Sequence, residues 1–156
     1  MEKYSIREVI EQAIQTEKLG YALYLQMANR FEKDEKLRRL FETLAVKEQE
    51  HEKTFTDLKE KVNDRRVEHW EEVSKYLRAI VESEFFLGSD KALPSLEHLN
   101  NIEDAVRYAL VFEKETLLYY HGMKDLLREK DILDKLINEE KSHIVWLSEF
   151  RKTINK

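Results

Sequence analysis

The chain has 156 residues, a formal net charge of −5 and 42% hydrophobic residues, a composition that suits one domain with its own core. It has only three glycines and one proline, and this shortage of turn-forming residues excludes a β-sandwich or barrel with many hairpins. Because cysteine is absent, disulfides, thiolate-bound metals and a cysteine nucleophile are excluded, and any metal must be held by histidine and carboxylate. We therefore expect a single all-α domain over residues 1–156.

Apolar residues at helical spacing predict four long helices, which span 5–32, 35–63, 102–128 and 131–154. Four polar residues stand where helix N-caps are expected, and they are Ser5, Asp34, Asn101 and Asp131. Residues 64–101 join the second helix to the third and contain a shorter helical pattern around Tyr76 and Leu77. We therefore expect a four-helix bundle with a long crossover between helices two and three that carries a short extra helix.

The apolar face of each long helix is interrupted near its middle by a glutamate. These four residues are Glu17, Glu48, Glu113 and Glu140. In the second and fourth helices a histidine follows one turn later, as His51 and His143, and in the first and third a tyrosine follows two turns later, as Tyr24 and Tyr120. The first pair of helices is thus repeated, with the same internal spacing, by the second pair.

Antiparallel pairing brings these side chains to one depth in the bundle. If the first two helices turn near Lys33 and Asp34, Glu17 lies level with Glu48 and His51, and the other two helices align their glutamates and histidine in the same way. Four buried carboxylates are very unfavourable as bare anions, whereas two divalent cations would balance them. Two single glutamates with two Glu-x-x-His pairs match the di-iron or di-manganese arrangement of ferritin-like bundles.

Other polar residues near these positions have simpler explanations. Tyr24 and Tyr120 are either plain core aromatics or hydroxyl donors to the ligand carboxylates, and both interpretations stay open. Three histidines off the apolar faces are expected at the surface, namely His69, His98 and His121. Three glutamates that neighbour the candidate ligands in sequence are expected to be solvated, namely Glu50, Glu115 and Glu139.

The segments AIQTEKLGYALYLQM, LAVKEQEHEKTF, ALVFEKETLLYYHGM and LINEEKSHIVWL resemble the four metal-binding helices of the ferritin-like superfamily, and most closely those of the rubrerythrin di-iron domain. The resemblance implies two iron ions, with manganese or zinc as alternatives. It implies six ligands, namely Glu17, Glu48, His51, Glu113, Glu140 and His143. Each ion would take one histidine, and Glu48 and Glu140 would bridge the two ions.

The chain departs from its relatives at three points. Full-length rubrerythrins add a rubredoxin-like iron site held by cysteines, so electrons here would come from a separate donor protein. Thr116 stands where they usually have an extra glutamate, and this difference weakens the peroxidase interpretation. Bacterioferritins share the six-ligand set, but their haem methionine would fall at Gln49, so we expect no haem.

We expect a cytoplasmic non-haem di-iron redox enzyme that reacts with hydrogen peroxide or dioxygen. A ferroxidase for iron oxidation or storage is one alternative, and a metal-free helical interaction module is an alternative of another class. The sequence has no apolar run long enough for a membrane span and no basic face, so neither a membrane nor nucleic acid is an expected partner. The apolar crossover, which includes Phe85 and Phe86, predicts a homodimer.

Overall fold

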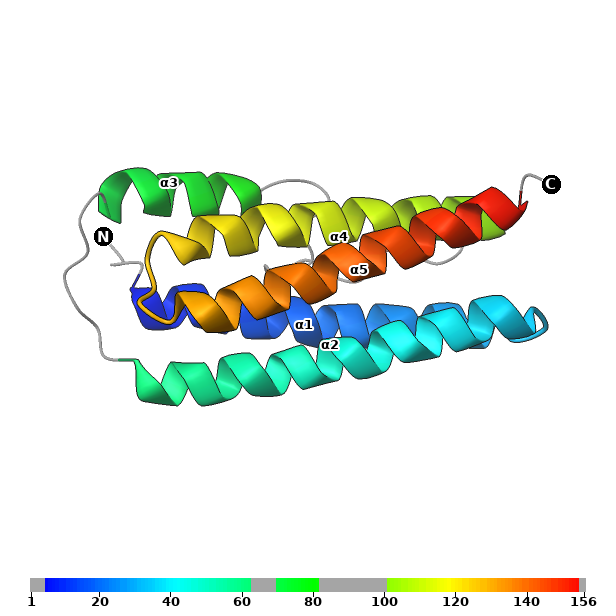
Figure 1. The fold of residues 1–156 in the computed structure, drawn as a ribbon, viewed down its shortest axis with the longest axis horizontal. Helices are drawn as coiled ribbons and strands as arrows, with labels where there is room; N and C mark the ends of the chain where they lie inside the picture. The colour runs from blue at the N-terminus through cyan, green and yellow to red at the C-terminus, as the bar shows by residue number, and fades with distance from the viewer. Residues whose placement is uncertain (1–4, 63–69, 82–100, 155–156) are drawn as a thin grey trace.

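A computed structural model of the chain describes residues 5–62, 70–81 and 101–154. Its helices are α1 (Ile6–Arg30), α2 (Glu35–Lys61), α3 (Trp70–Val81), α4 (Ile102–Lys124) and α5 (Lys130–Ile154). Helices α1 and α2 form one antiparallel pair, and α4 and α5 form the other (Figure 1). The predicted all-α four-helix bundle is therefore confirmed.

The connection between α2 and α4 is long because of where these two helices lie. Helix α2 ends at one end of the bundle and α4 begins at the opposite end, so the two points that are connected lie a full bundle length apart (Figure 1). Helix α3 belongs to this connection and packs against α4. The predicted crossover with a short extra helix is confirmed, whereas Phe85 and Phe86 lie outside the described residues.

Polar side chains cap the N-termini of three of the long helices, as predicted. Ser5 and Glu8 form a reciprocal capping box, in which each side chain accepts a hydrogen bond from the other residue's backbone N–H. Asp34 and Asn101 each accept from the N–H three residues further on, at 3.1 and 2.8 Å. These bonds satisfy N–H groups that have no partner within the helix and so define where α1, α2 and α4 begin.

Asp131 is not an N-cap, and that prediction is wrong. The N–H of Leu133 donates to the carbonyl of Glu129, so α5 begins at Lys130, one residue before the expected cap. Asp131 lies instead in the first turn, where the helix dipole favours a carboxylate.

Helix α4 also ends earlier than the predicted residue 128. Its last residue is Lys124, and the N–H groups of Asp125 and Leu126 donate to carbonyls three residues back rather than four. This tightening closes the last turn of the helix. Leu126 and Leu127 stay buried beyond it, so their apolar spacing extended the predicted helix too far.

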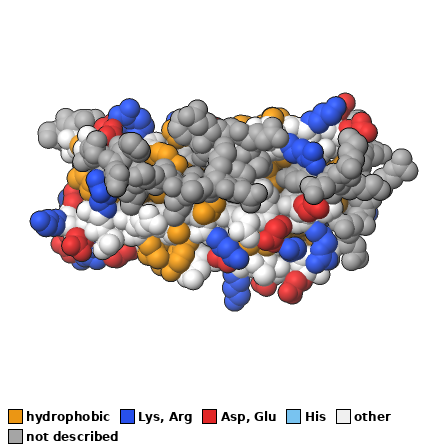
Figure 2. Space-filling model, turned by 180° about the vertical axis from the view of Figure 1, so that it is seen from behind, with side chains coloured by type: hydrophobic (Ala, Val, Ile, Leu, Met, Phe, Trp, Pro, Cys, Tyr) orange, Lys and Arg blue, Asp and Glu red, His pale blue; other side chains and the backbone are white. Residues whose placement is uncertain are grey.

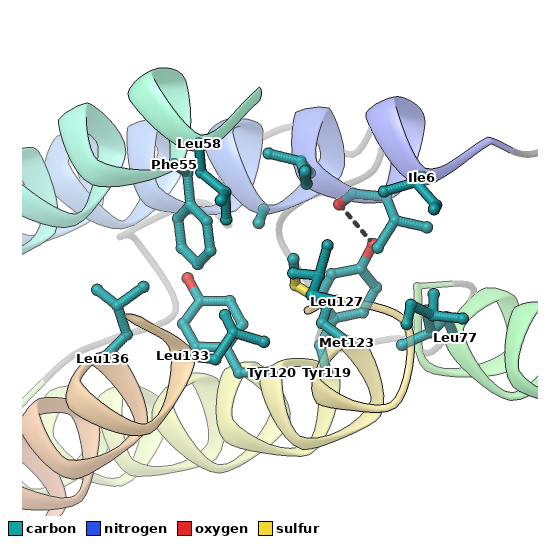
Figure 3. Packing of buried hydrophobic residues seen from close by; sticks show 14 of the residues in the cluster. Ile6, Phe55, Leu58, Leu77, Tyr119, Tyr120, Met123, Leu127, Leu133 and Leu136 are labelled. Atoms are coloured by element: carbon teal, nitrogen blue, oxygen red, sulfur yellow. Dashed lines mark hydrogen bonds between the residues drawn. The ribbon is translucent and has the colours of Figure 1, made fainter. Parts of the chain in front are cut away.

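Two apolar clusters fill the two ends of the bundle. In one of them the rings of Phe55 and Tyr120 meet edge to face with their centroids 5.1 Å apart (Figure 3). In the other the rings of Tyr24 and Phe41 stack at 6.0 Å. Each of the four long helices carries its buried glutamate, and in α2 and α5 also its histidine, between these two clusters. The buried polar layer is therefore enclosed by apolar side chains on both sides.

The surface carries charged side chains of both signs. On the face shown in Figure 2, lysine and arginine side chains are interspersed with aspartate and glutamate over the described residues. Such mixing gives that part of the surface no basic stripe for a phosphate backbone. Of the helices described, none combines the length and the apolar character that crossing a membrane requires.

Gly122 allows α3 to approach α4 closely. A Cβ atom at this position would lie 2.6 Å from Cδ2 of Leu77 and 3.2 Å from the ring of Tyr76. Leu77 is completely buried, so its side chain has little room to move away. The docking of the crossover helix therefore depends on the absence of a side chain at residue 122.

We predict that Gly122→Ala lowers the free energy of unfolding, although alanine favours a helix over glycine by about 1 kcal/mol. In a Leu77→Ala background the obstructing methyl group is gone, and the same Gly122→Ala substitution should instead raise the free energy of unfolding by up to about 1 kcal/mol. Urea denaturation of the four proteins measures both effects. If Gly122→Ala has the same effect in both backgrounds, Leu77 does not limit the space at residue 122.

Candidate metal centre

All six predicted ligand residues lie together in the polar layer at the middle of the bundle. Each long helix contributes at its midpoint, and none of the six residues is more than 1% exposed. The six are Glu17 from α1, Glu48 and His51 from α2, Glu113 from α4, and Glu140 and His143 from α5. The antiparallel alignment expected from the sequence therefore does bring these side chains to one depth.

The six residues form two overlapping groups. One group contains Glu17 and His51 and the other contains Glu113 and His143, while Glu48 and Glu140 belong to both. Within each group, one potential ligand atom from every residue lies within 4.8 Å of the others. Two sets of oxygen and nitrogen atoms that share two carboxylates have the composition and spacing of a dimetal site.

His51 is held at both ring nitrogens. Its Nδ1 lies 2.8 Å from Oε1 of Glu140 and 3.7 Å from Oε1 of Glu17, so this nitrogen faces the carboxylate cluster. Its Nε2 lies 2.5 Å from Oε2 of Glu139 on the opposite side of the ring. When the ring is neutral, a hydrogen bond from Nε2 to this carboxylate leaves the lone pair of Nδ1 directed toward the cluster.

The contact with Glu139 corrects the expectation that this residue is solvated. Glu139 precedes Glu140, so it is turned about 100° around α5, which places it toward α2 rather than in open solvent. Its side chain is 35% exposed. Neither the helical spacing nor the internal repeat distinguishes a residue turned toward a neighbouring helix from one turned toward solvent, and for this reason the contact was missed.

His143 faces the same cluster from the other half of the bundle. Its Nδ1 lies 3.2 Å from Glu140 Oε2, 3.4 Å from Glu113 Oε1 and 3.5 Å from Glu48 Oε1. The two imidazole rings stack, with centroids 5.7 Å apart and planes inclined by 16°. The indole ring of Trp146 lies 5.4 Å from the His143 ring.

The two buried tyrosines bind carboxylates across the bundle. Tyr24 of α1 donates to Oε1 of Glu113 in α4 at 2.6 Å, and Tyr120 of α4 donates to Oε1 of Glu17 in α1. Of the two interpretations left open by the sequence, the structure shows the hydroxyl donors. Each tyrosine bonds the glutamate of the other half, so the two halves of the repeat orient each other's carboxylates.

Burial is the main influence on how these groups ionise. It raises the pKa values of Glu17, Glu48 and Glu113 well above the ordinary range, and the neighbouring charge of Glu140 raises them further. Burial also opposes the charge of Glu140, but the close approach of Glu113 and of both histidines outweighs burial and lowers the pKa of Glu140.

The same balance acts on the histidines. Burial disfavours the charged form of His51, but its hydrogen bond with Glu140 and the charge of that carboxylate outweigh burial and raise the pKa of His51 to about 9. Burial likewise disfavours the charged form of His143, but the carboxylates of Glu113 and Glu140, 3.4 and 3.2 Å from its Nδ1, outweigh burial and raise the pKa of His143. Without metal the cluster thus holds protons that a metal ion would have to displace.

Several buried atoms of the cluster have no hydrogen-bond partner. They are one oxygen each of Glu17, Glu113 and Glu140, both oxygens of Glu48, and both ring nitrogens of His143. Burying polar atoms without partners costs free energy, so the convergence of these atoms at one place indicates that a ligand binds there. Divalent cations fit this set, because carboxylate oxygen and imidazole nitrogen are their usual donors.

Gly20 leaves room for one of these carboxylates. A Cβ atom at residue 20 would lie 3.1 Å from Oε2 of Glu48 and 3.0 Å from the ring of Phe112. At the corresponding place in α4, the buried Thr116 donates its hydroxyl to the carbonyl of Phe112 at 2.9 Å. Neither position supplies a carboxylate, and within the described part of the chain the two groups consist of the six residues named above.

The other polar residues singled out in the sequence lie away from the cluster. His121 is exposed, as expected. Glu50 is also exposed and pairs with Lys47 at 3.4 Å, whereas Glu115 is half-buried. His69 and His98 lie outside the described residues.

Comparison with known proteins identifies the family of the chain and agrees with its fold. The family model described as Rubrerythrin matches residues 8–150. A solved structure described as a ferritin-like diiron-carboxylate protein from Thermotoga maritima superposes with a TM-score of 0.69, at 20% sequence identity over 95% of each chain. No curated protein matches the sequence significantly. At that identity the structural likeness concerns the fold.

We predict that metal uptake releases protons and that metal affinity rises with pH up to about pH 9. The raised pKa of His51, about 9, keeps this histidine protonated at neutral pH, and only the neutral ring binds a metal. Calorimetric titration with Mn²⁺ in buffers of different ionisation enthalpy, at pH 6, 7 and 8, measures the protons released. Binding that releases no protons and is independent of pH would contradict this description of the cluster.

Proposed function

Because the chain belongs to the rubrerythrin family, we propose that it is a non-haem di-iron redox enzyme that reduces hydrogen peroxide or dioxygen with electrons from a separate donor protein. The observation that supports this most strongly is the pair of buried glutamate and histidine groups that share Glu48 and Glu140. The sequence contains no cysteine, so no rubredoxin-like iron site within it could supply the electrons.

The six residues of the cluster divide between two ion positions. Glu17 and His51 would hold one ion, Glu113 and His143 would hold the other, and Glu48 and Glu140 would serve both. Two ferrous ions, when bound there, would supply the two electrons that, with two protons, convert hydrogen peroxide to two water molecules. The donor set of four carboxylates and two imidazoles suits iron or manganese and also accepts zinc.

The surrounding residues position the ligands and exclude water. The pKa values of Tyr24 and Tyr120 are raised well above the ordinary range, by burial first and by the neighbouring carboxylates second, so both hydroxyls stay protonated and keep donating to Glu113 and Glu17. The apolar clusters on both sides of the layer keep bulk water away from it. In such a site the charge of each carboxylate acts strongly on a bound cation.

A ferroxidase is the second candidate, and Thr116 is the observation that favours it. The extra glutamate usual at this position in rubrerythrins belongs to their redox-dependent site, and the Thr116 hydroxyl bonds a backbone carbonyl instead. The metal-free interaction module receives less support, since it leaves the partnerless atoms of Glu48 and His143 unexplained.

We predict that protein loaded anaerobically with ferrous iron holds about two ions per chain. Replacing Glu48 or Glu140 with alanine should reduce the bound metal to near zero, because each residue belongs to both groups. Glu50→Ala is the matched control, since Glu50 is exposed on the same helix as Glu48 and should leave the metal content unchanged. Metal analysis after gel filtration measures all three; a protein that takes up no metal would support the interaction module.

We further predict that hydrogen peroxide oxidises the ferrous ions of the loaded protein several-fold faster than dioxygen does. Repeated turnover should require an external reductant. Stopped-flow absorbance with each oxidant measures the two rates. A ferroxidase would instead consume many ferrous ions per site without a reductant and retain the iron, and a sizing column with iron detection would show the retained iron.

We also propose that the protein is a homodimer that uses the crossover helix α3 and the region of Phe85 and Phe86. In this helix Leu77 and Ile80 are buried, while Tyr76, whose ring lies beside Gly122 of α4, is still 46% exposed. The predicted interface includes Phe85 and Phe86, which follow α3 in the sequence. Exposed apolar surface of this kind is typical of interfaces, and two-fold dimers are the commonest assemblies.

Light scattering at tens of micromolar should give a mass twice the 18.8 kDa of one chain. Phe85→Ser with Phe86→Ser, or Tyr76→Glu, should shift the mass toward that of the monomer. A monomeric unmodified protein would refute the dimer, and a dimer that survives all three substitutions would place the interface elsewhere.

A further inference from the structure

The two halves of the cluster differ at the residue that precedes each Glu-x-x-His pair. In α5 this residue is Glu139, and in α2 the corresponding residue is Lys47. Elsewhere the halves are closely matched, since each has one histidine, one unshared glutamate and one tyrosine hydroxyl bonded to that glutamate. The exchange of an acidic for a basic residue is therefore a specific difference between two otherwise similar positions.

This difference reaches the histidines directly. Nε2 of His51 lies 2.5 Å from Oε2 of Glu139, whereas Nε2 of His143 is buried and has no hydrogen-bond partner. Lys47 has no acceptor to offer, and its ammonium group lies 3.4 Å from Glu50 instead. Thus one imidazole is oriented by a carboxylate behind it, and the other lacks such a partner.

A carboxylate behind a ligating histidine has known physical effects. It fixes which ring nitrogen carries the proton, restrains the orientation of the ring and makes the other nitrogen a stronger donor. Loss of such a partner typically lowers metal affinity by about 10- to 100-fold. The Glu139 contact should therefore distinguish the two metal positions.

We propose that Glu139 makes the two metal positions unequal, so that the position with Glu17 and His51 binds its ion first and more tightly than the position with Glu113 and His143. Glu139 acts here as a positioning residue, through the imidazole of His51. The inference rests on the proposed dimetal site and adds an order of filling to it.

The test isolates each position with a histidine substitution. His143→Ala leaves the position that contains His51, and His51→Ala leaves the position that contains His143. Anaerobic calorimetric titration with Mn²⁺ alone measures the affinity of each, and circular dichroism checks that every variant is helical. Before any change at residue 139, the His143→Ala protein should bind Mn²⁺ more tightly than the His51→Ala protein.

Glu139→Ala should weaken Mn²⁺ binding by about 10- to 100-fold in the His143→Ala protein and by less than about twofold in the His51→Ala protein. Glu149→Ala, a change at an exposed glutamate of the same helix, should alter neither affinity. Glu139→Gln keeps the size of the side chain and an uncharged acceptor, so it should give a smaller loss confined to the same position. A general structural role of Glu139 would weaken both positions equally, and that result would overturn the inference.

The reciprocal substitution tests the same idea by a gain of binding. Lys47→Glu supplies a carboxylate at the position that corresponds to Glu139, so it should strengthen Mn²⁺ binding in the His51→Ala protein.

Electron paramagnetic resonance of the unmodified protein at one equivalent of Mn²⁺ should show an isolated ion; a predominantly coupled pair at one equivalent would contradict sequential filling. If the unmodified protein binds no metal, the dimetal site itself fails, whereas two ions of equal affinity overturn only the order of filling.

Discussion

Four carboxylates buried in one layer are the constraint on which the rest of this structure depends. None of the four glutamates is exposed, and apolar clusters close the layer on both sides. A buried anion without a partner is strongly unfavourable, so the layer must either keep protons or hold cations. The raised pKa values of Glu17, Glu48 and Glu113, caused chiefly by burial, describe the first state, and the partnerless oxygen atoms are the donors available for the second.

The topology of the bundle brings equivalent residues of its two antiparallel pairs into this layer. Each antiparallel pair supplies one single glutamate and one Glu-x-x-His pair, and each tyrosine bonds the glutamate of the opposite pair. The pairs thereby stabilise each other through the polar layer as well as through the apolar clusters. The long crossover allows α4 and α5 to repeat the arrangement of α1 and α2. Within this crossover α3 packs against α4, and Gly122 provides the space for that contact.

The spacing of residues predicted both the bundle and the residues of its layer, because a buried helix face leaves a periodic pattern and antiparallel helices align residues about their turn. Local geometry was less predictable. The end of α4 and the start of α5 depend on backbone hydrogen bonds around Leu126 and Glu129, which apolar spacing does not reveal. Glu139 was missed because its role depends on which helix lies beside α5. Periodicity along one helix carries no information about its neighbour.

We propose that the buried layer holds two cations between Glu48 and Glu140. Anomalous diffraction from crystals grown after anaerobic loading with ferrous iron tests it most directly. We expect two peaks about 3.5–4 Å apart, each beside one histidine and both in contact with the two shared glutamates. A map without peaks in this layer, in a crystal whose iron lies only at the surface, would contradict the account.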